Sequence, residues 1–245
     1  MATTTFTPSM LRGAGTRGIP EIPAGSSFSN TYSLAFDGVD DYVKAPLDGT
    51  STGGILAASD SDVELTISFW FYMDGSQNLK GIFQWAEKLI SLSPMVLIQT
   101  NGASIRTYVD GGYRHTSGLT TNAWHHYATT RTASTNTWQG YIDGASVFTM
   151  NDGGAISARS NASDLYFGVG YNGYLNGNID EVAVWNSVQD VATIYNSGVP
   201  NDLSSLSPLA WYRFEEGSGT TAIDSGTGGN NGTISGATYS TNVPT

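Results

Sequence analysis

The chain has 245 residues, of which 39% are hydrophobic and 11% aromatic, so it can bury a sizeable core. Its formal net charge is −11, from 21 acidic and 10 basic side chains, and the basic ones are scattered singly. Because phosphate binding needs clustered cations, this distribution argues against a nucleic-acid partner. The absence of cysteine excludes disulfides, thiolate catalysis and cysteine-ligated zinc.

Residues 1–30 are rich in Thr, Gly, Pro and Ser and show no hydrophobic period, which predicts an extended arm. Arg12 and Arg17 make this arm basic on an acidic chain, so we expect it to anchor on a partner; a free terminus is the alternative. No apolar run reaches the length of a signal-peptide core or the ~20 residues of a membrane span. We therefore expect synthesis in a cytosol and no membrane association.

From residue 31 onward, short segments of β-branched and aromatic residues alternate with turn residues. The expected strands are, in chain order, SLAFDG, YVKAP, VELTISFWFYM, SPMVLIQT, SIRTYVDG, AWHHYATTR, TWQGYIDG, ASVFTM, DLYFGVG and NIDEVAVWN. Asp-Gly pairs, which suit two-residue hairpin turns, begin at residues 37, 48, 74, 110, 143 and 152. This pattern predicts an all-β protein built as a two-sheet antiparallel sandwich.

One short helix is expected near residues 187–197. Ser187 is a suitable N-cap, Asp190 follows three residues later as a capping-box partner, and Gly198 lies just past the end. The expected apolar face consists of Val188, Val191, Ile194 and Tyr195.

A further strand, AWYRFEE, follows the expected helix, and a Gly- and Asn-rich loop comes after it. Some forty residues cannot bury a core alone. We therefore expect residues 207–236 to supply a closing strand and loop to a single sandwich that spans residues 31–245.

Three carboxylates lie within five residues in FDGVDDYV: Asp37, Asp40 and Asp41. Asp37 followed by glycine is typical of a hairpin turn. The alternative is a structural calcium site, because hard cations take six to eight oxygen ligands. Asp180 and Asp224 are the other two candidate ligands for such a site.

Catalysis by paired carboxylates is the least expected function. A retaining glycosidase needs two carboxyl groups about 5 Å apart. Asp180 and Glu181 are adjacent on an expected strand, and adjacent strand residues face opposite ways. The same alternation places His125 and His126 on opposite faces, so we expect one to be enclosed and the other exposed, with no shared metal.

Aromatic residues in Gly-rich loops are the candidates for glycan binding, because exposed rings stack on sugars. These candidates are Tyr113, Tyr171 and Tyr174, together with His115 in the same loop as Tyr113.

Taken in order, YSLAFDGVDDYVKAP, LTISFWFYMD, NAWHHYATT, GYIDG, LYFGVG and LNGNIDEVAVWNSVQD resemble laminin-G-like domains of the concanavalin A-like lectin/glucanase superfamily. The resemblance covers residues 32 to about 198. It implies a jelly-roll fold, binding of glycans or proteins, and in many members a structural calcium.

Glucanases of the superfamily carry a catalytic strand with the pattern E-[ILV]-D-x-E. Only Asp180 matches it here, since Asn178 and Val182 occupy the positions of the nucleophile and the acid/base. The resemblance therefore does not extend to hydrolysis, and we expect no enzymatic activity.

The Thr-rich N-terminal segment beside such a domain is similar to virion proteins of marine bacteriophages. This implies a structural and display protein on a virion surface, made in the host cytoplasm. The arm would contact other virion proteins or further copies of the chain, and the sandwich would bind a neighbouring protein or a cell-surface glycan. The alternative is an extracellular bacterial carbohydrate-binding module or adhesin.

Overall fold

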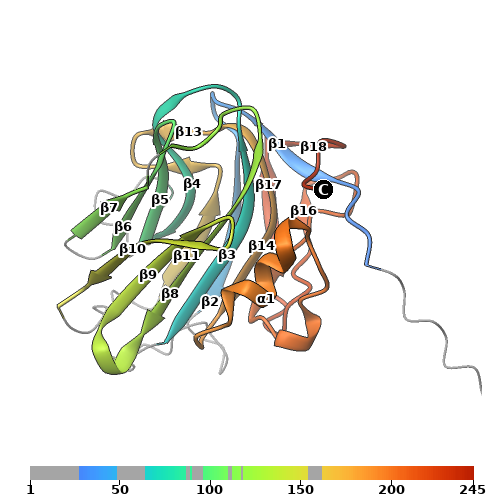
Figure 1. The fold of residues 1–245 in the computed structure, drawn as a ribbon. Helices are drawn as coiled ribbons and strands as arrows, with labels where there is room; N and C mark the ends of the chain where they lie inside the picture. Colours follow the sequence, from blue (N-terminus) through green and yellow to red (C-terminus); the bar gives the residue numbers. More distant parts are fainter. Residues whose placement is uncertain are drawn as a thin grey trace, which may run out of the picture.

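The computed structural model describes residues 28–48, 64–86, 89, 96–109, 112–116, 118–153 and 162–245. In this part of the chain, two sheets pack face to face and one short α-helix lies beside them, as Figure 1 shows. This architecture confirms the predicted all-β sandwich. Most of the expected N-terminal arm, including Arg12 and Arg17, lies outside the described residues.

The first sheet has eight antiparallel strands in the order β10-β9-β8-β3-β14-β1-β18, and β15 also pairs with β14. The strands are β1 (Ser33–Asp37), β3 (Leu65–Met73), β8 (Trp124–Thr132), β9 (Thr137–Ile142), β10 (Ala145–Asn151), β14 (Asn176–Trp185), β15 (Ala210–Tyr212) and β18 (Thr238–Ser240). Asp143 and Gly144 both have positive φ in the turn between β9 and β10, as expected for an Asp-Gly hairpin.

The second sheet has ten strands, eight of them in the order β16-β17-β2-β11-β4-β5-β6-β7, with the β12–β13 hairpin attached to β4. The strands are β2 (Tyr42–Asp48), β4 (Gln77–Ala86), β5 (Val96–Gly102), β6 (Ile105–Val109), β7 (Gly112–His115), β11 (Ala162–Phe167), β12 (Val169–Gly170), β13 (Gly173–Tyr174), β16 (Thr221–Ala222) and β17 (Gly232–Ser235).

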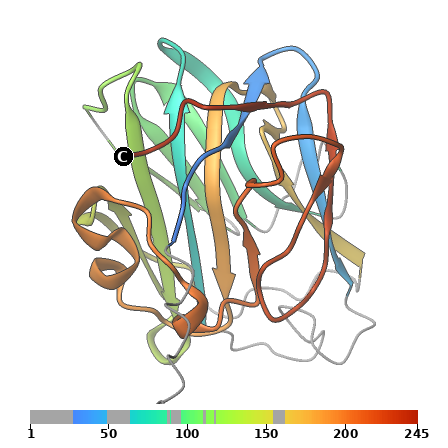
Figure 2. The same cartoon turned by 90° about the vertical axis from the view of Figure 1, so that its right-hand side faces the viewer.

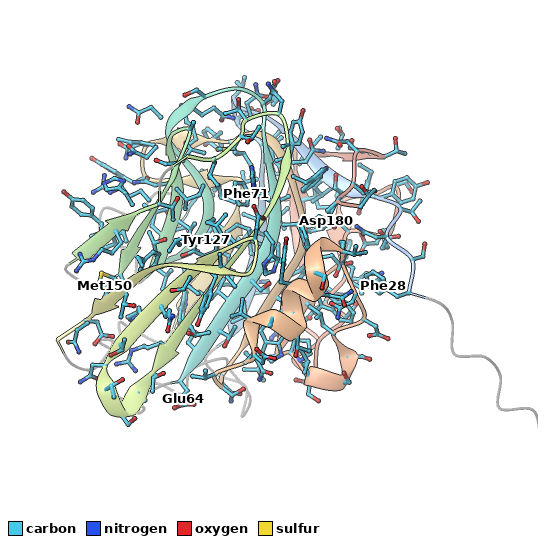
Figure 3. The ribbon with its side chains drawn as sticks, in the orientation of Figure 1. Phe28, Glu64, Phe71, Tyr127, Met150 and Asp180 are labelled. Atoms are coloured by element: carbon cyan, nitrogen blue, oxygen red, sulfur yellow. The ribbon has the colours of Figure 1, made fainter. Side chains whose placement is uncertain are left out.

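Aromatic side chains connect the two sheets across the core. The ring of Phe69 on β3 stacks on Phe83 of the second sheet at 6.1 Å and on Tyr127 of β8 at 5.1 Å between centroids. The hydroxyl of Tyr127 lies 2.7 Å from that of Thr107 on β6, so the polar tip of this buried ring is satisfied across the interface. Figure 3 shows Tyr127 and Phe71 between the sheets.

A layer of helical turns covers the outer face of the first sheet around β14. It contains α1 (Val191–Tyr195) and the 3-10 turns η3 (Asn196–Gly198) and η4 (Ser204–Leu206); a further turn, η2 (Ala133–Thr135), follows β8. The packed apolar cluster consists of Ala183, Trp185, Ile194, Leu203 and Trp211. The outer face of β14 is therefore as well covered as its inner face.

The helix is capped differently from the expectation. Asp190 is the N-cap, because its Oδ1 accepts a hydrogen bond from the backbone N–H of Ala192 at 3.1 Å. Ser187 lies before the helix, and its carbonyl accepts from the Thr66 hydroxyl at 2.7 Å instead. Asn196 in the left-handed region ends the helix after only five residues.

The two adjacent histidines do face opposite ways, but neither is exposed: His126 is buried and His125 is half-buried. His126 faces outward and is fully buried beside Tyr195 of α1, and burial lowers its pKa to about 3. The His125 side chain is 12% exposed, since Asp143 in the β9–β10 turn accepts from its Nδ1 at 2.7 Å. The expectation that one of the two would be exposed is therefore wrong.

The C-terminal residues belong to both sheets. In the first sheet β15 pairs with β14 and β18 pairs with β1, while in the second sheet β17 pairs with β2. Figure 2 shows this segment in red beside the blue N-terminal strand. No helix in the described part of the chain is long and apolar enough to cross a bilayer.

Candidate functional site

The outer face of the second sheet carries polar and aromatic side chains at its β7 edge. Along β6, the side chains of Ile105, Thr107 and Val109 are buried toward the core, so those of Arg106 and Tyr108 point outward. Directly opposite residues share a face across neighbouring strands. The same face therefore holds a group that we name the β5–β7 platform: Gln99, Asn101, Arg106, Tyr108, Tyr113 and His115.

Strand register brings the platform residues together in two rows. Gln99 lies opposite Arg106, and Arg106 lies opposite His115. In the next row Tyr108 lies opposite Tyr113. Neighbouring strands are about 4.8 Å apart. The second row, which crosses two strands, is therefore about as wide as one sugar ring, and the first row, which crosses three strands, is about as wide as two.

Direct contacts hold the platform side chains in place. The Arg106 guanidinium lies 4.1 Å from the centre of the Tyr113 ring, and the Tyr113 and His115 rings meet edge to face at 5.2 Å. His115 Nδ1 lies 3.1 Å from Asn101 Nδ2. Even so, the Tyr113 ring remains 49% exposed, so one aromatic face is available to a ligand.

The β12–β13 hairpin lies against the same outward face. Tyr174 pairs with Gly81 of β4, and Gly81 lies opposite Gln99 of the platform. A Cβ at Gly81 would come within 2.1 Å of the backbone nitrogen of Gly170, so only glycine permits this close approach. The hairpin also carries Tyr171, which is 45% exposed.

The four residues predicted to bind glycan thus fall into two pairs on one sheet. Tyr113 and His115 are in contact on β7, while Tyr171 and Tyr174 belong to the hairpin on β4. The remaining platform residues, Arg106 among them, were missed. The alternation in SIRTYV could have placed Arg106 outward, but its position opposite His115 depends on strand register that the sequence does not reveal.

The acidic group at the start of β2 is compact. Ligand oxygens of Asp37, Asp40 and Asp41 all lie within 4.8 Å of one another. Asp37 Oδ1 accepts from the backbone N–H of Val39 at 2.8 Å, as expected for a turn, and Asp41 Oδ2 accepts from the N–H of Asp37 at 2.9 Å. Burial, and then the two neighbouring carboxylates, raise the pKa of Asp41.

The other two candidate metal ligands are not part of this group. Asp224, after β16, accepts backbone N–H bonds from Trp211, Gly226 and Asn230, each at 2.8 Å, and so organises the closing loop. Asp180 lies on β14 near α1, as Figure 3 shows.

Asp180 and Glu181 form a buried carboxyl pair that strand alternation did not predict. The register of β14 against β3 shifts between Asp180 and Ala183, and Glu181 adopts φ 49°. The N–H of Glu181 donates to Asp180 Oδ1 at 2.8 Å. This bulge lets both carboxyl groups interact on one side of the strand, so the expectation that they face opposite ways is wrong.

The carboxyl pair is enclosed by residues from distant segments. Trp211 Nε1 donates to Glu181 Oε2 at 2.6 Å, and Arg213 Nε donates to Oε1 at 3.2 Å. Asn30 Nδ2 donates to Asp180 Oδ2 at 3.0 Å. The Arg213 guanidinium also stacks on Phe28 at 4.5 Å, so residues 28–30, assigned to the arm from the sequence, pack on the sandwich.

Burial raises the pKa of Glu181 to about 8, even though Arg213 opposes the shift. Burial and the neighbouring Glu181 also raise the pKa of Asp180 well above its ordinary value. Asp180 is 0% exposed and Glu181 is 3% exposed, so neither carboxyl group can reach a glycosidic bond in this structure.

The family of the chain follows from a match over residues 37–195 to the Laminin_G_3 model of the Concanavalin A-like lectin/glucanases superfamily. The chain belongs to this superfamily. Among curated proteins, no sequence matches it.

Solved structures share the fold at low sequence identity. A Bacteroides ovatus protein named as a candidate carbohydrate binding protein superposes with a TM-score of 0.64 and 17% identity, over 89% of this chain and 62% of its own. For a native heptameric SAP-like pentraxin from Limulus polyphemus the TM-score is 0.50 and the identity 13%, over 70% and 82%.

A sialidase from Trypanosoma rangeli gives a TM-score of 0.51 and 12% identity, over 66% of this chain and 27% of the sialidase. The chain therefore spans less than two thirds of the Bacteroides protein and about a quarter of the sialidase. At these identities the comparison shows a common lectin-like sandwich fold.

The buried carboxyl pair predicts that stability depends on pH. Glu181 has a folded-state pKa of about 8 and an ordinary value of 4.5, so folding favours its protonated form. The resulting stability is fully present below about pH 4.5 and is lost as the pH rises through about 8. We expect the free energy of unfolding of the wild type to fall by roughly 2–3 kcal/mol from about pH 5.5 to 8.5, relative to Glu181→Gln.

Chemical denaturation at both pH values measures this difference. Glu64→Gln, at a half-buried site away from the pair, is the control and should keep the wild-type pH dependence. Parallel pH profiles for the wild type and Glu181→Gln would contradict the prediction.

Proposed function

We propose that this protein is a non-enzymatic binding protein whose lectin-like sandwich binds glycans on the β5–β7 platform. The observation that carries the proposal is the exposure of two aromatic rings. Seven large hydrophobic side chains are exposed among the described residues, and the two aromatic ones are Tyr113 and Tyr171. Both belong to the platform or to the hairpin beside it, where polar groups of Asn101, Arg106 and His115 are available for sugar hydroxyls.

The carboxylates support a binding function over hydrolysis. Asp180 and Glu181 are buried under the outer layer of the first sheet, on the opposite side of the sandwich from the platform. Asn178 and Val182, their neighbours on β14, supply no carboxyl group. A bound glycan on the platform would meet no acid/base pair among the described residues.

Display on a virion surface is the setting that we propose for this binding. The Thr-rich basic arm would anchor the sandwich on other virion proteins or on further copies of the chain, after synthesis in a host cytoplasm. An extracellular carbohydrate-binding module or adhesin of a bacterium is the alternative. The shared fold with the named Bacteroides ovatus protein favours this alternative.

A structural calcium ion at Asp37, Asp40 and Asp41 is also part of the proposal. Hard cations prefer carboxylate oxygens, and a bound cation would offset the repulsion that helps to raise the pKa of Asp41. The ion would hold together the β1–β2 turn, which supplies all three carboxylates.

Removal of the exposed ring tests the binding site. We expect Tyr113→Ala to weaken glycan binding roughly fivefold, because an aromatic stacking contact contributes about 1 kcal/mol. Tyr113→Phe should retain most of the affinity. Ile223→Ala, a 49% exposed residue outside the platform, is the control. A glycan array that is blank for the wild type at high protein concentration would refute the proposed function.

Assembly distinguishes the two settings. Light scattering after size-exclusion chromatography should show assembly of the full chain, and monomers for a variant that lacks residues 1–27. The cut spares Phe28 and Asn30, which pack on the sandwich. The double variant Arg12→Gln, Arg17→Gln keeps the length of the arm and isolates its charge. If every form is monomeric, the free-standing module is the better assignment.

Calcium addition tests the acidic group. At a calcium concentration about 100 times its dissociation constant, the free energy of unfolding rises by about 2.7 kcal/mol. We therefore expect the wild-type Tm to rise by several degrees and that of Asp40→Asn to stay unchanged. Asp40 is exposed, so its substitution spares the turn bonds of Asp37 and Asp41. An equal rise in both proteins, or none in the wild type, would count against this site.

A further inference from the structure

The described cationic side chains fall into two classes. Three of them contact a carboxyl group: Lys44 contacts Asp164 at 2.9 Å, Arg131 contacts Asp152 at 2.7 Å, and Arg213 contacts Glu181 at 3.2 Å. The other three described cations, Lys80, Arg106 and Arg114, form no ion pair. All three belong to β4, β6 and β7, which lie at one end of the second sheet.

The strands at this end of the sheet carry no acidic residue in the part of the chain that the structure describes. The described residues 77–86, 96–109, 112–116 and 169–174 contain neither Asp nor Glu, although the whole chain has 21 of them and a net charge of −11. The strands and the hairpin around the platform are therefore locally cationic on an acidic protein. Arg114 faces the other way, toward Met150 at the rim of the core. Lys80 lies on β4 with its Nζ beside Gly173 of the β12–β13 hairpin, which leaves Arg106 as the cation within the platform.

Arg106 is oriented but not neutralised. Its guanidinium lies 4.1 Å from the Tyr113 ring centre, and its Nε is buried without a hydrogen-bond partner. Gln99, directly opposite, is 2% exposed, and its Oε1 also has no partner. With Nε enclosed, the two terminal amino groups are the donors that can face a ligand. Stacking on the ring holds their plane without cancelling the charge.

A planar fork of this kind suits a carboxylate. The two terminal amino groups of an arginine bind both oxygens of one carboxylate, and such charge-assisted bonds are stronger than neutral ones. A densely charged polyanion is disfavoured, because it would extend over the rest of a protein whose net charge is −11, and like charges that come within the Debye length of about 8 Å repel one another. A sparsely charged ligand with single carboxylates avoids most of this repulsion.

We propose that the β5–β7 platform selects acidic glycans, that is, oligosaccharides with isolated carboxylate-bearing sugars. The carboxylate pairs with Arg106, and the adjacent sugar ring packs on the exposed face of Tyr113. This assignment rests on the proposed glycan-binding function and specifies its ligand class.

Matched oligosaccharides test the assignment by calorimetry. The probes are short oligosaccharides that contain glucuronic, galacturonic or sialic acid, each with its carboxyl-reduced neutral counterpart. We expect the wild type to bind at least one acidic probe about tenfold or more tightly than its neutral partner. Arg106→Gln should abolish this preference and Arg106→Lys should reduce it, because lysine keeps the charge but lacks the fork.

Lys44→Gln is the matched control, since Lys44 lies on the same sheet but pairs with Asp164, and it should keep the wild-type preference. Equal binding of acidic and neutral probes would overturn the acidic assignment and leave the proposed function standing. No binding of any probe would overturn both. Sulfated oligosaccharides of the same length are a further probe, and equal affinity for sulfated and carboxylated probes, lost in Arg106→Gln, would overturn the carboxylate assignment. If a variant fails to fold, the preference of the wild type for acidic over neutral probes still tests the proposal.

Discussion

Burial of β14 on both faces is the constraint on which the rest of the structure depends. Nine of its ten residues are buried, so each face needs a covering layer. The second sheet covers the inner face, while the α1 layer and the N-terminal and C-terminal segments cover the outer face. Because Asp180 and Glu181 lie beneath the outer cover, that cover must also supply polar partners, which are Asn30, Trp211 and Arg213.

This arrangement makes the two outer faces of the sandwich unequal. The outer face of the first sheet is covered by protein around β14, where apolar residues and the carboxyl pair are enclosed. The corresponding face of the second sheet keeps exposed aromatic and cationic groups at its β7 edge, where Tyr113 is half exposed. Recruitment of the C-terminal segment to cover β14 thus leaves the platform as the surface where rings and hydrogen-bonding groups can meet a ligand.

Local signals predicted the sandwich, because strand alternation and Asp-Gly turns such as Asp143-Gly144 depend on adjacent residues. The same rule failed at Asp180 and Glu181, where a bulge against β3 overrides alternation. A bulge depends on the register of a strand about a hundred residues away, which no local pattern encodes. Tyr113 and His115 were predicted as ligand-binding residues because they lie in a Gly-rich stretch, which the structure shows to contain strand β7. The position of Arg106 beside them depends on the pairing of three strands.

The chain uses its cations in two ways, and the difference bears on function. Arg131 and its partner Asp152 are almost fully buried, so the charge of Arg131 serves the internal structure and does not face solvent. Arg106 is held by an aromatic ring and by strand register, and it forms no ion pair with a described residue. On a protein with twice as many acids as bases, a cation can remain unpaired only where the neighbouring strands exclude acids. The acid-free sequence of the described parts of β4 to β7 meets that condition, and it leaves the charge of Arg106 available to a ligand.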